Sequence, residues 1–331
     1  MSLDTPSTSL DLSRPTLSGW RQQLGSVLLG RWAPGGQRPQ VHTDDLLQAP
    51  RSHWPVARAL LHSPGAVLGL SVLLFIVLMA LSANYWYPGD PLDMVGQPLL
   101  SPGEDWEFPL GTDALGRDLA AGIVHGARVS LLVGITAALV SVLIGTLIGA
   151  LAGYFGGRVD RVLTWLIEIF QTTPSFLLVV VVVSITQSTV GIIAVVIGLT
   201  SWDTVARLVR AEFRALLGAD FVLAARSVGY STGWIIFREV LPNALPPIII
   251  TASVIVASAI LTESSLSFLG VGDPNNISWG SMIGSGRDML RSALYLTAIP
   301  GLALVITVFS LNLVGDALIS ALNPRLRGRT A

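Results

Sequence analysis

The sequence predicts an all-α protein that crosses a membrane about six times. Of its 331 residues, 51% are hydrophobic and only 12% are charged, and its mean hydropathy is +0.66. Soluble proteins carry about 25% charged residues, so this deficit indicates a membrane protein. Six apolar stretches are long enough to cross the roughly 30 Å of a bilayer's hydrocarbon core as helices.

Six separate apolar stretches make up the predicted transmembrane domain. We expect the spans at residues 65–87, 130–154, 162–186, 189–212, 246–269 and 295–319. The first ends in the aromatic run YWY (85–87), which is typical of the position where a helix leaves the lipid. The whole domain covers residues 63–325 and is followed by a short tail, residues 326–331.

Residues 1–62 form an N-terminal segment ahead of the spans. Within it, LSGWRQQLGSVLLGRW (17–32) places Trp20, Leu24 and Leu28 one helical turn apart. Arginines lie within and after this apolar stripe, a pattern typical of an amphipathic helix at a membrane surface. A helix packed against the protein's own cytoplasmic face explains the pattern equally well, so both interpretations stay open.

The distribution of arginine predicts that both termini lie in the cytoplasm, because cytoplasmic loops are enriched in basic residues. In this orientation the outer side holds only Arg117, Arg128, Arg287 and Arg291, together with many acidic loop residues. The other sixteen of the 20 arginines lie on the cytoplasmic side: Arg14, Arg21, Arg31, Arg38, Arg51, Arg58, Arg158, Arg161, Arg207, Arg210, Arg214, Arg226, Arg238, Arg325, Arg327 and Arg329.

Missing residue types exclude several functions. The chain has no cysteine, and all 20 of its basic residues are arginine. Thiolate metal sites and cysteine nucleophiles are therefore excluded, and without lysine the chain cannot bind ATP through an ordinary P-loop. Three of the four histidines precede the first span, which argues against an intramembrane histidine metal site. A net charge of −1 gives no indication of nucleic-acid binding.

One motif resembles an enzyme signature but lacks its context. Residues Gly229 to Gly233 (GYSTG) match the G-x-S-x-G turn of serine hydrolases. That turn follows a strand and needs a histidine later in the chain. Here the flanking residues are helical in pattern and no histidine follows His125. We therefore expect no catalytic residue, no metal and no cofactor on this chain.

Two acidic residues lie inside predicted spans, where charge is costly and often marks a translocation path. Glu168 falls in the third span, and Glu263 falls in the fifth beside Ser264. We consider these three residues candidates for the path. A structural hydrogen bond to a neighbouring helix is the alternative for each acid. The histidines and the internal repeats that many proton-coupled carriers use are not found.

The second span carries glycines at 145, 149, 153 and 157, each four residues apart. Glycines at this spacing form a smooth strip on which another helix can pack closely. The strip serves either static packing or a moving helix interface, and the sequence does not separate the two.

We expect specific polar interactions at two further positions within the spans. Pro174 interrupts the third span and frees a backbone carbonyl, which Thr172, Thr173 or a neighbour must satisfy. In the fourth span Asp203 and Arg207 are four residues apart, so we expect them to form an ion pair.

A half-polar stretch of about thirty residues separates the fourth and fifth spans. Apolar residues at 221, 224, 225 and 228 predict a short amphipathic helix that ends at Gly229. We expect a second short helix, GWIIFREV (233–240), to end at Leu241-Pro242, and Pro246-Pro247 to begin the fifth span. The result is a compact helical knob, which either docks on a partner or packs on its own chain.

The same stretch resembles the EAA loop of ABC importer permeases. That motif has Glu-Ala-Ala, three further residues, Gly, and later Leu-Pro. The matching residues are Ala224, Ala225, Gly229, Leu241 and Pro242. Leu223 stands where the family has glutamate, so a salt link from that position is not carried over.

Further blocks resemble the C-type permeases of dipeptide, oligopeptide and nickel importers. They follow in order over residues 64–326: LGTDALGRDLAAGIVHGARVSLLVG (110–134), AGYFGGRVD (152–160), ARLVRAEFRAL (206–216), SLSFLGVG (265–272), SWGSMI (278–283) and NLVGDALISALNPR (312–325). The resemblance implies the type I importer permease fold in a bacterial inner membrane.

The resemblance also implies partners and a mechanism. The chain pairs with a similar B-type permease, two P-loop ATPase subunits bind inside, and an extracytoplasmic binding protein delivers the solute. The matched loop acts as a coupling helix in an ATPase groove, so ATP and Mg²⁺ belong to partner subunits. Short peptides are the expected solute; nickel, metal chelates, glutathione and opines are alternatives. A stand-alone secondary transporter and a membrane scaffold protein are the rivals from other classes.

Overall fold

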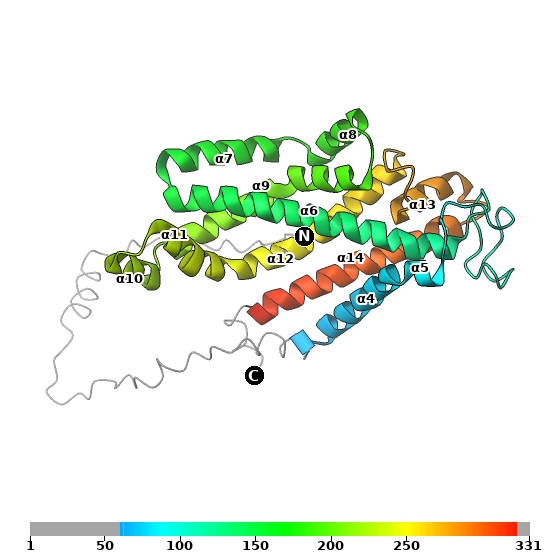
Figure 1. The fold of residues 1–331 in the computed structure, drawn as a ribbon, viewed down its shortest axis with the longest axis horizontal. Coiled ribbons are helices and arrows are strands. Elements are labelled where there is room, and N and C mark those ends of the chain that lie inside the picture. Colours follow the sequence, from blue (N-terminus) through cyan, green and yellow to red (C-terminus); the bar gives the residue numbers. More distant parts are fainter. Residues whose placement is uncertain (1–59, 62, 323–331) are drawn as a thin grey trace, which may run out of the picture. The chain divides into compact units, whose positions relative to one another are not determined.

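The computed structural model describes residues 60–61 and 63–322, and this part of the chain is built from helices without a β-strand (Figure 1). The predicted helix at 17–32 and the tail lie outside the described residues. The elements in order are α4 (Pro64–Leu81), α5 (Ala83–Trp86), α6 (Leu119–Phe155), α7 (Gly157–Thr172), α8 (Ser175–Ile185), α9 (Val190–Leu216), α10 (Asp220–Val228), α11 (Thr232–Trp234), the π-helix η1 (Ile235–Val240), α12 (Leu241–Phe268), α13 (Trp279–Gly286), the 3₁₀ helix η2 (Arg287–Met289) and α14 (Tyr295–Leu322).

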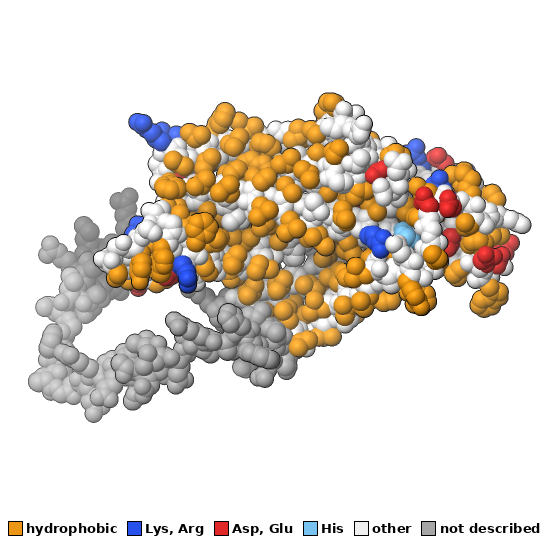
Figure 2. All heavy atoms as spheres, viewed as in Figure 1, with side chains coloured by type: hydrophobic (Ala, Val, Ile, Leu, Met, Phe, Trp, Pro, Cys, Tyr) orange, Lys and Arg blue, Asp and Glu red, His pale blue; other side chains and the backbone are white. Residues whose placement is uncertain are grey.

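The helices confirm an all-α membrane fold with about six spans. Five of them are long and apolar enough to cross a bilayer: α4, α6, α9, the continuous run from α11 to α12, and α14. The pair α7 and α8 passes the same test only together. Figure 2 shows hydrophobic side chains covering the middle of the visible face, with charged side chains gathered toward its ends.

The second span begins well before the predicted residue 130, because α6 starts at Leu119. Asp118 caps its first turn, and its carboxylate accepts a hydrogen bond from the Ala120 N–H at 2.8 Å. The added turns are largely apolar but contain His125 and Arg128, which lie outside the uninterrupted apolar window on which the prediction was based.

The third span is broken rather than merely kinked at Pro174. Helices α7 and α8 meet there at 82°. Both Thr172 and Thr173 donate their hydroxyl hydrogens to the Ile169 carbonyl, at 3.0 and 2.9 Å. These threonines therefore satisfy a carbonyl at the break, but it is that of Ile169 and not that of Phe170, which Pro174 leaves without its helical partner.

The fifth span starts inside the knob, which corrects the predicted second short helix. The run from Thr232 to Phe268 is continuous and does not end at Leu241-Pro242. The π-helix η1 explains this, since the Leu241 N–H bonds to the Ile236 carbonyl five residues back. Its wider turn precedes Pro242, whose ring would clash in an ordinary α-helix. Pro246 and Pro247 lie within α12 and do not begin it.

Helices α6 and α9 pack closely through three of the four predicted glycines. A Cβ on Gly145 would lie 2.5 Å from the Cβ of Val205, and one on Gly149 would lie 2.5 Å from the Ala206 carbonyl oxygen. Gly153 faces Phe213 in the same way. Gly157 does not belong to this contact, because it begins α7 and faces open space.

We expect Gly149→Leu to destabilise the protein by roughly 1–3 kcal/mol, because overpacking forces helices apart. Gly301→Leu in α14 is the matched control, since nothing lies within 4 Å of a Cβ at that position. The midpoint of thermal unfolding in detergent measures both. An equal effect of the two substitutions would show that the α6–α9 contact is not tight.

Candidate functional site

The knob between α9 and α12 is built on α10 (Figure 1). Gly229 ends this helix in the left-handed conformation, with φ of 87°. Its N–H bonds to the Arg226 carbonyl at 3.0 Å, and the Tyr230 N–H bonds to the Ala225 carbonyl at 3.2 Å. These two bonds form a Schellman motif, so the predicted glycine stop is confirmed.

One face of α10 is fixed to the rest of the chain. Val222 and Ala225 are buried and belong to a hydrophobic cluster with Phe213 of α9 and with Ile235 and Val240 of η1. The predicted short amphipathic helix is therefore confirmed, but its apolar residues divide between a buried and an exposed side. Of the four apolar residues on which it was based, Ala225 alone is buried, because the face is set by Val222 one residue after Phe221.

The rest of the surface of α10 is exposed and carries four apolar residues among polar ones. Phe221 is 39% exposed, Leu223 is 47% exposed and Val228 is 75% exposed. Ala224, between them, is also exposed and leaves the surface low. We call Phe221, Leu223, Ala224 and Val228 the outer face of the knob. A large apolar surface on a rigid base is typical of a binding site for a partner protein.

The remaining residues of the loop support the knob. The Tyr230 and Trp234 rings stack with centroids 3.8 Å apart. Ser231, the serine of the GYSTG motif, accepts a hydrogen bond from the Trp234 N–H as a helix cap. Leu241 is half-buried beside the cluster and Pro242 is exposed. The motif thus caps a helix and does not present a nucleophile.

Asp160 holds α7 against α9 at the knob end, and sequence reasoning did not single it out. Its carboxylate accepts hydrogen bonds from Arg210, at 3.0 Å through Nη2, and from Arg214. Asp160 itself is buried. In the sequence, Asp160 is visible only as an acid at the end of the AGYFGGRVD block, and Arg210 and Arg214 as two arginines four residues apart at the end of the fourth span. Their pairing depends on tertiary structure.

The predicted ion pair between Asp203 and Arg207 is wrong. Among the described residues, no ion pair within 4.0 Å joins them. Arg207 Nη1 donates instead to the Gln171 side-chain oxygen at 3.2 Å. Gln171 lies on the end of α7 next to the break at Pro174, and the bent helix brings it within reach of α9.

The two acids considered for the path occupy different environments. Glu263 is only 3% exposed, and it accepts a hydrogen bond from the Ser267 hydroxyl at 2.7 Å. The neighbouring Ser264 hydroxyl donates to the other carboxylate oxygen of Glu263 at 3.4 Å. Ser264 also lines an apolar groove of about 510 Å³. Glu168 is exposed on α7. The surroundings of Glu263 agree with the structural alternative.

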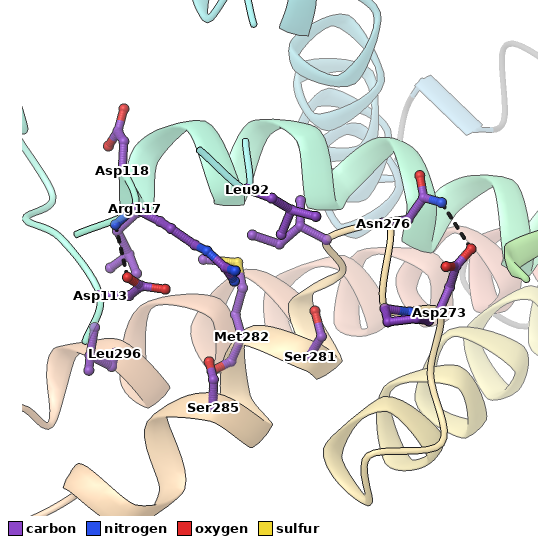
Figure 3. A pocket seen from close by; sticks show the side chains of 13 residues that line it. Leu92, Asp113, Arg117, Asp118, Asp273, Asn276, Ser281, Met282, Ser285 and Leu296 are labelled. Carbon is purple, nitrogen blue, oxygen red and sulfur yellow. Dashed lines mark hydrogen bonds between the residues drawn. The ribbon is translucent and has the colours of Figure 1, made fainter. Parts of the chain in front are cut away.

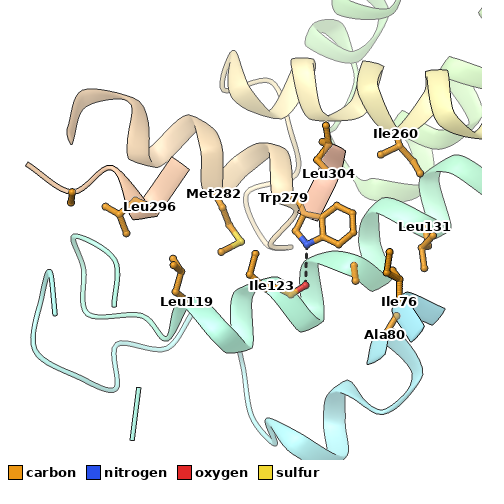
Figure 4. Close-up of a cluster of buried hydrophobic side chains, with 12 residues drawn as sticks. Ile76, Ala80, Leu119, Ile123, Leu131, Ile260, Trp279, Met282, Leu296 and Leu304 are labelled. Carbon is orange, nitrogen blue, oxygen red and sulfur yellow. Dashed lines mark hydrogen bonds between the residues drawn. The ribbon is translucent and has the colours of Figure 1, made fainter. Parts of the chain in front are cut away.

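The SWGSMI block (278–283) joins three helices, as Figure 4 shows. Ser278 caps α13, and the fully buried Trp279 donates its ring N–H to the Ile123 carbonyl of α6 at 3.0 Å. Gly280 lies so close to α12 that a Cβ would come within 2.4 Å of the Ser264 Cα. This block therefore positions α13 against α6 and the Glu263 region.

A small pocket of about 130 Å³ lies between the start of α6, the 273–277 loop and α13. Figure 3 shows the Arg117 side chain extending across it toward Met282. Asp118 caps α6 beside the pocket, and burial raises the pKa of its carboxyl above the ordinary value, although backbone N–H groups oppose this. The pocket brings the 110–134 block of the sequence together with the 278–283 block.

A second hollow, of about 260 Å³, lies beside the break between α7 and α8 and is lined by α9 and α12. We call it the polar hollow because most of its lining side chains are polar: Gln171, Thr200, Asp203, Thr204, Thr251 and Ser258 among them. Sequence reasoning missed it, since hydroxyl residues scattered over three spans give no local signal.

The bundle of membrane helices with its knob agrees with the architecture expected for an importer permease, and comparisons with known proteins show the family. The pattern of the family described as "Binding-protein-dependent transport system inner membrane component" matches residues 145–328. The pattern described as "N-terminal TM domain of oligopeptide transport permease C" matches residues 53–102. The chain belongs to this family of ABC importer permeases, and the resemblance seen in the sequence is confirmed.

Individual relatives cover most of the chain. The oligopeptide transport system permease protein OppC of Escherichia coli K12 is 40% identical over 285 residues, which are 84% of this chain and 93% of the relative. The di/tripeptide transport system permease protein DppC of Pseudomonas aeruginosa is 38% identical over 272 residues, or 80% of this chain and 90% of the relative.

A solved structure shares the fold. An inward-facing structure of the MetNI methionine ABC transporter matches with a TM-score of 0.50 and 21% identity, over 61% of this chain and 96% of that one. At this identity the likeness shows the fold alone.

We expect Asp160→Asn to lower the free energy of unfolding by about 1.5–3 kcal/mol, the usual range for hydrogen bonds to charged groups. Loss of the carboxylate charge weakens the contact of α7 with Arg210 and Arg214. Asp288→Asn is the control, because its pair with Arg287 at 3.6 Å is exposed and such pairs contribute little. Chemical denaturation in detergent measures both; a control loss as large as that of Asp160→Asn would contradict the assignment.

Proposed function

We propose that this chain is a transmembrane permease subunit of an ATP-driven importer for short peptides, and that α10 is its coupling helix. The observation that carries the proposal is the outer face of the knob. It is exposed and rich in apolar side chains, whereas another side of the same helix is fixed in the core through Val222 and Ala225. A surface presented on such a rigid base suits docking into a groove on a partner.

The partners follow from the family. We infer a homologous B-type permease beside this chain, two P-loop ATPase subunits against the knob, and an extracytoplasmic binding protein at the opposite end. ATP and Mg²⁺ bind to the ATPase subunits. The absence of lysine from the chain supports this assignment.

The orientation of the protein in the membrane follows from the distribution of its arginines. We infer that the knob end faces the cytoplasm, that both termini lie on that side and that the protein is in a bacterial inner membrane. Arg210, Arg214, Arg226 and Arg238 lie near the knob, as the positive-inside rule requires.

The coupling residues are those of the matched loop. Ala224 keeps the outer face low, and Ala225 fixes the inner face. Gly229 ends the helix in a conformation that other residues adopt only with strain. Leu241 and Pro242 lie where η1 passes into α12, so a movement of α10 is transmitted directly along the fifth span.

Peptide transport is inferred from the names of the relatives, several of which are peptide or oligopeptide permeases. Nickel, metal chelates, glutathione and opines remain alternative solutes for the same machinery. A stand-alone secondary transporter is the alternative from another class, and it requires neither an ATPase nor the outer face of the knob.

We expect Val228→Asp to weaken ATPase binding at least tenfold, because it places a charge in a desolvated contact. Affinity of the purified permease pair for the ATPase subunits, together with ATP-driven uptake, measures the effect. Met94→Asp is the matched control, since Met94 is 66% exposed in the loop before α6, at the opposite end. Unchanged ATPase affinity and uptake in Val228→Asp would refute the coupling role.

A further inference from the structure

The polar hollow holds the carboxylate of Asp203, which forms no ion pair within the described part of the chain. Asp203 lies about midway along α9, and no arginine in the described part of the chain comes within ion-pair distance of it. Arg207, one turn further on, is bonded to Gln171, whose amide also faces Asp203. Arg210 and Arg214 are occupied by Asp160. The charge of Arg207 still acts on the Asp203 carboxylate from a distance, but a carboxylate without an ion pair within a membrane span is costly and usually functional.

The hydroxyls around Asp203 add negative potential. Thr200 donates its hydrogen to the Val196 and Ile197 carbonyls, and Thr251 donates to the Pro247 carbonyl at 3.0 Å. Each hydroxyl hydrogen is directed into its own helix, so oxygen lone pairs remain available toward the hollow. The lining therefore offers acceptors and a negative charge.

The position of the hollow suits a transported solute. It lies midway along α9 and α12, beside the broken pair α7 and α8. Transporters place solute sites near the bilayer midplane, next to interrupted helices where the lining is polar. At about 260 Å³, the hollow has room for the end group of a peptide but not for a long peptide.

We infer that the polar hollow is a transient binding site for the amino-terminal ammonium group of the transported peptide, with Asp203 as its counter-charge. The inference rests on the proposed function and adds a chemical class of ligand to it. An ammonium group donates three hydrogen bonds, and the carboxylate with the Thr200 and Thr251 hydroxyls provides acceptors for them. The cation contacts the site only in passing, so its binding here is weak.

The absence of cysteine from the sequence makes a direct electrostatic test possible. Ser258→Cys places a single thiol of this chain in the hollow, because Ser258 lines it and is exposed. In the complete transporter in lipid nanodiscs, the thiol is modified by a cationic and by an anionic methanethiosulfonate reagent. Each rate is normalised to that reagent's rate with a free thiol in solution.

We expect the normalised cationic rate to exceed the anionic rate about tenfold, and Asp203→Asn to bring the two within twofold of each other. Asp203→Glu restores the preference. Asp316→Asn is the matched control, because Asp316 is an exposed acid on α14 outside the hollow, and it leaves the preference intact. A preference that survives Asp203→Asn, or no preference at all, would overturn the inference.

Transport supplies the second measurement. We expect Asp203→Asn to lower the maximal uptake of a dipeptide about tenfold at saturating binding protein, while ATP hydrolysis stimulated by the loaded binding protein stays within twofold. Equal loss of uptake and hydrolysis would indicate a structural role and contradict the site. If the unsubstituted transporter moves no peptide at all, the proposed function fails, and the thiol rates still report on the charge of the hollow.

Discussion

The close contact between α6 and α9 determines where the functional parts of this protein lie. Three glycines let the two backbones approach so closely that the Val205 and Phe213 side chains fill the space that a Cβ would need. The same α9 carries Asp203 at its midpoint and leads directly into the knob. Asp160 then adds α7 to this pair through Arg210 and Arg214.

From this base, a single continuous path connects the knob to the far end of the bundle. The inner face of α10 packs on η1, and η1 continues into α12 without a break. Helix α12 carries the wall of the polar hollow and then the buried Glu263, against which α13 packs through Gly280. In the proposed function, a displacement of α10 by an ATPase moves the wall of the hollow, because α10 packs on η1 and η1 continues into α12.

The sequence predicted what depends on local pattern. Hydropathy located the five long spans and the bent pair α7 and α8. The glycine at 229 marked the end of α10 correctly, because only its own backbone conformation matters there. What depends on tertiary structure was missed. The bond between Arg207 and Gln171 and the clustering of hydroxyls around Asp203 require segments that are distant in sequence to be placed side by side. The π-turn that carries the helix past Pro242 is local, but no simple sequence pattern marks it.

The proposed coupling role of α10 requires that its outer face contact an ATPase. Because the chain has no cysteine, a single Leu223→Cys carrying a short photoreactive cross-linker tests this in the complete transporter. The account predicts that light joins this position to an ATPase subunit, and that the same label at Met94 does not react with it. Cross-links from Leu223→Cys that form only within this chain or to lipid would contradict the account.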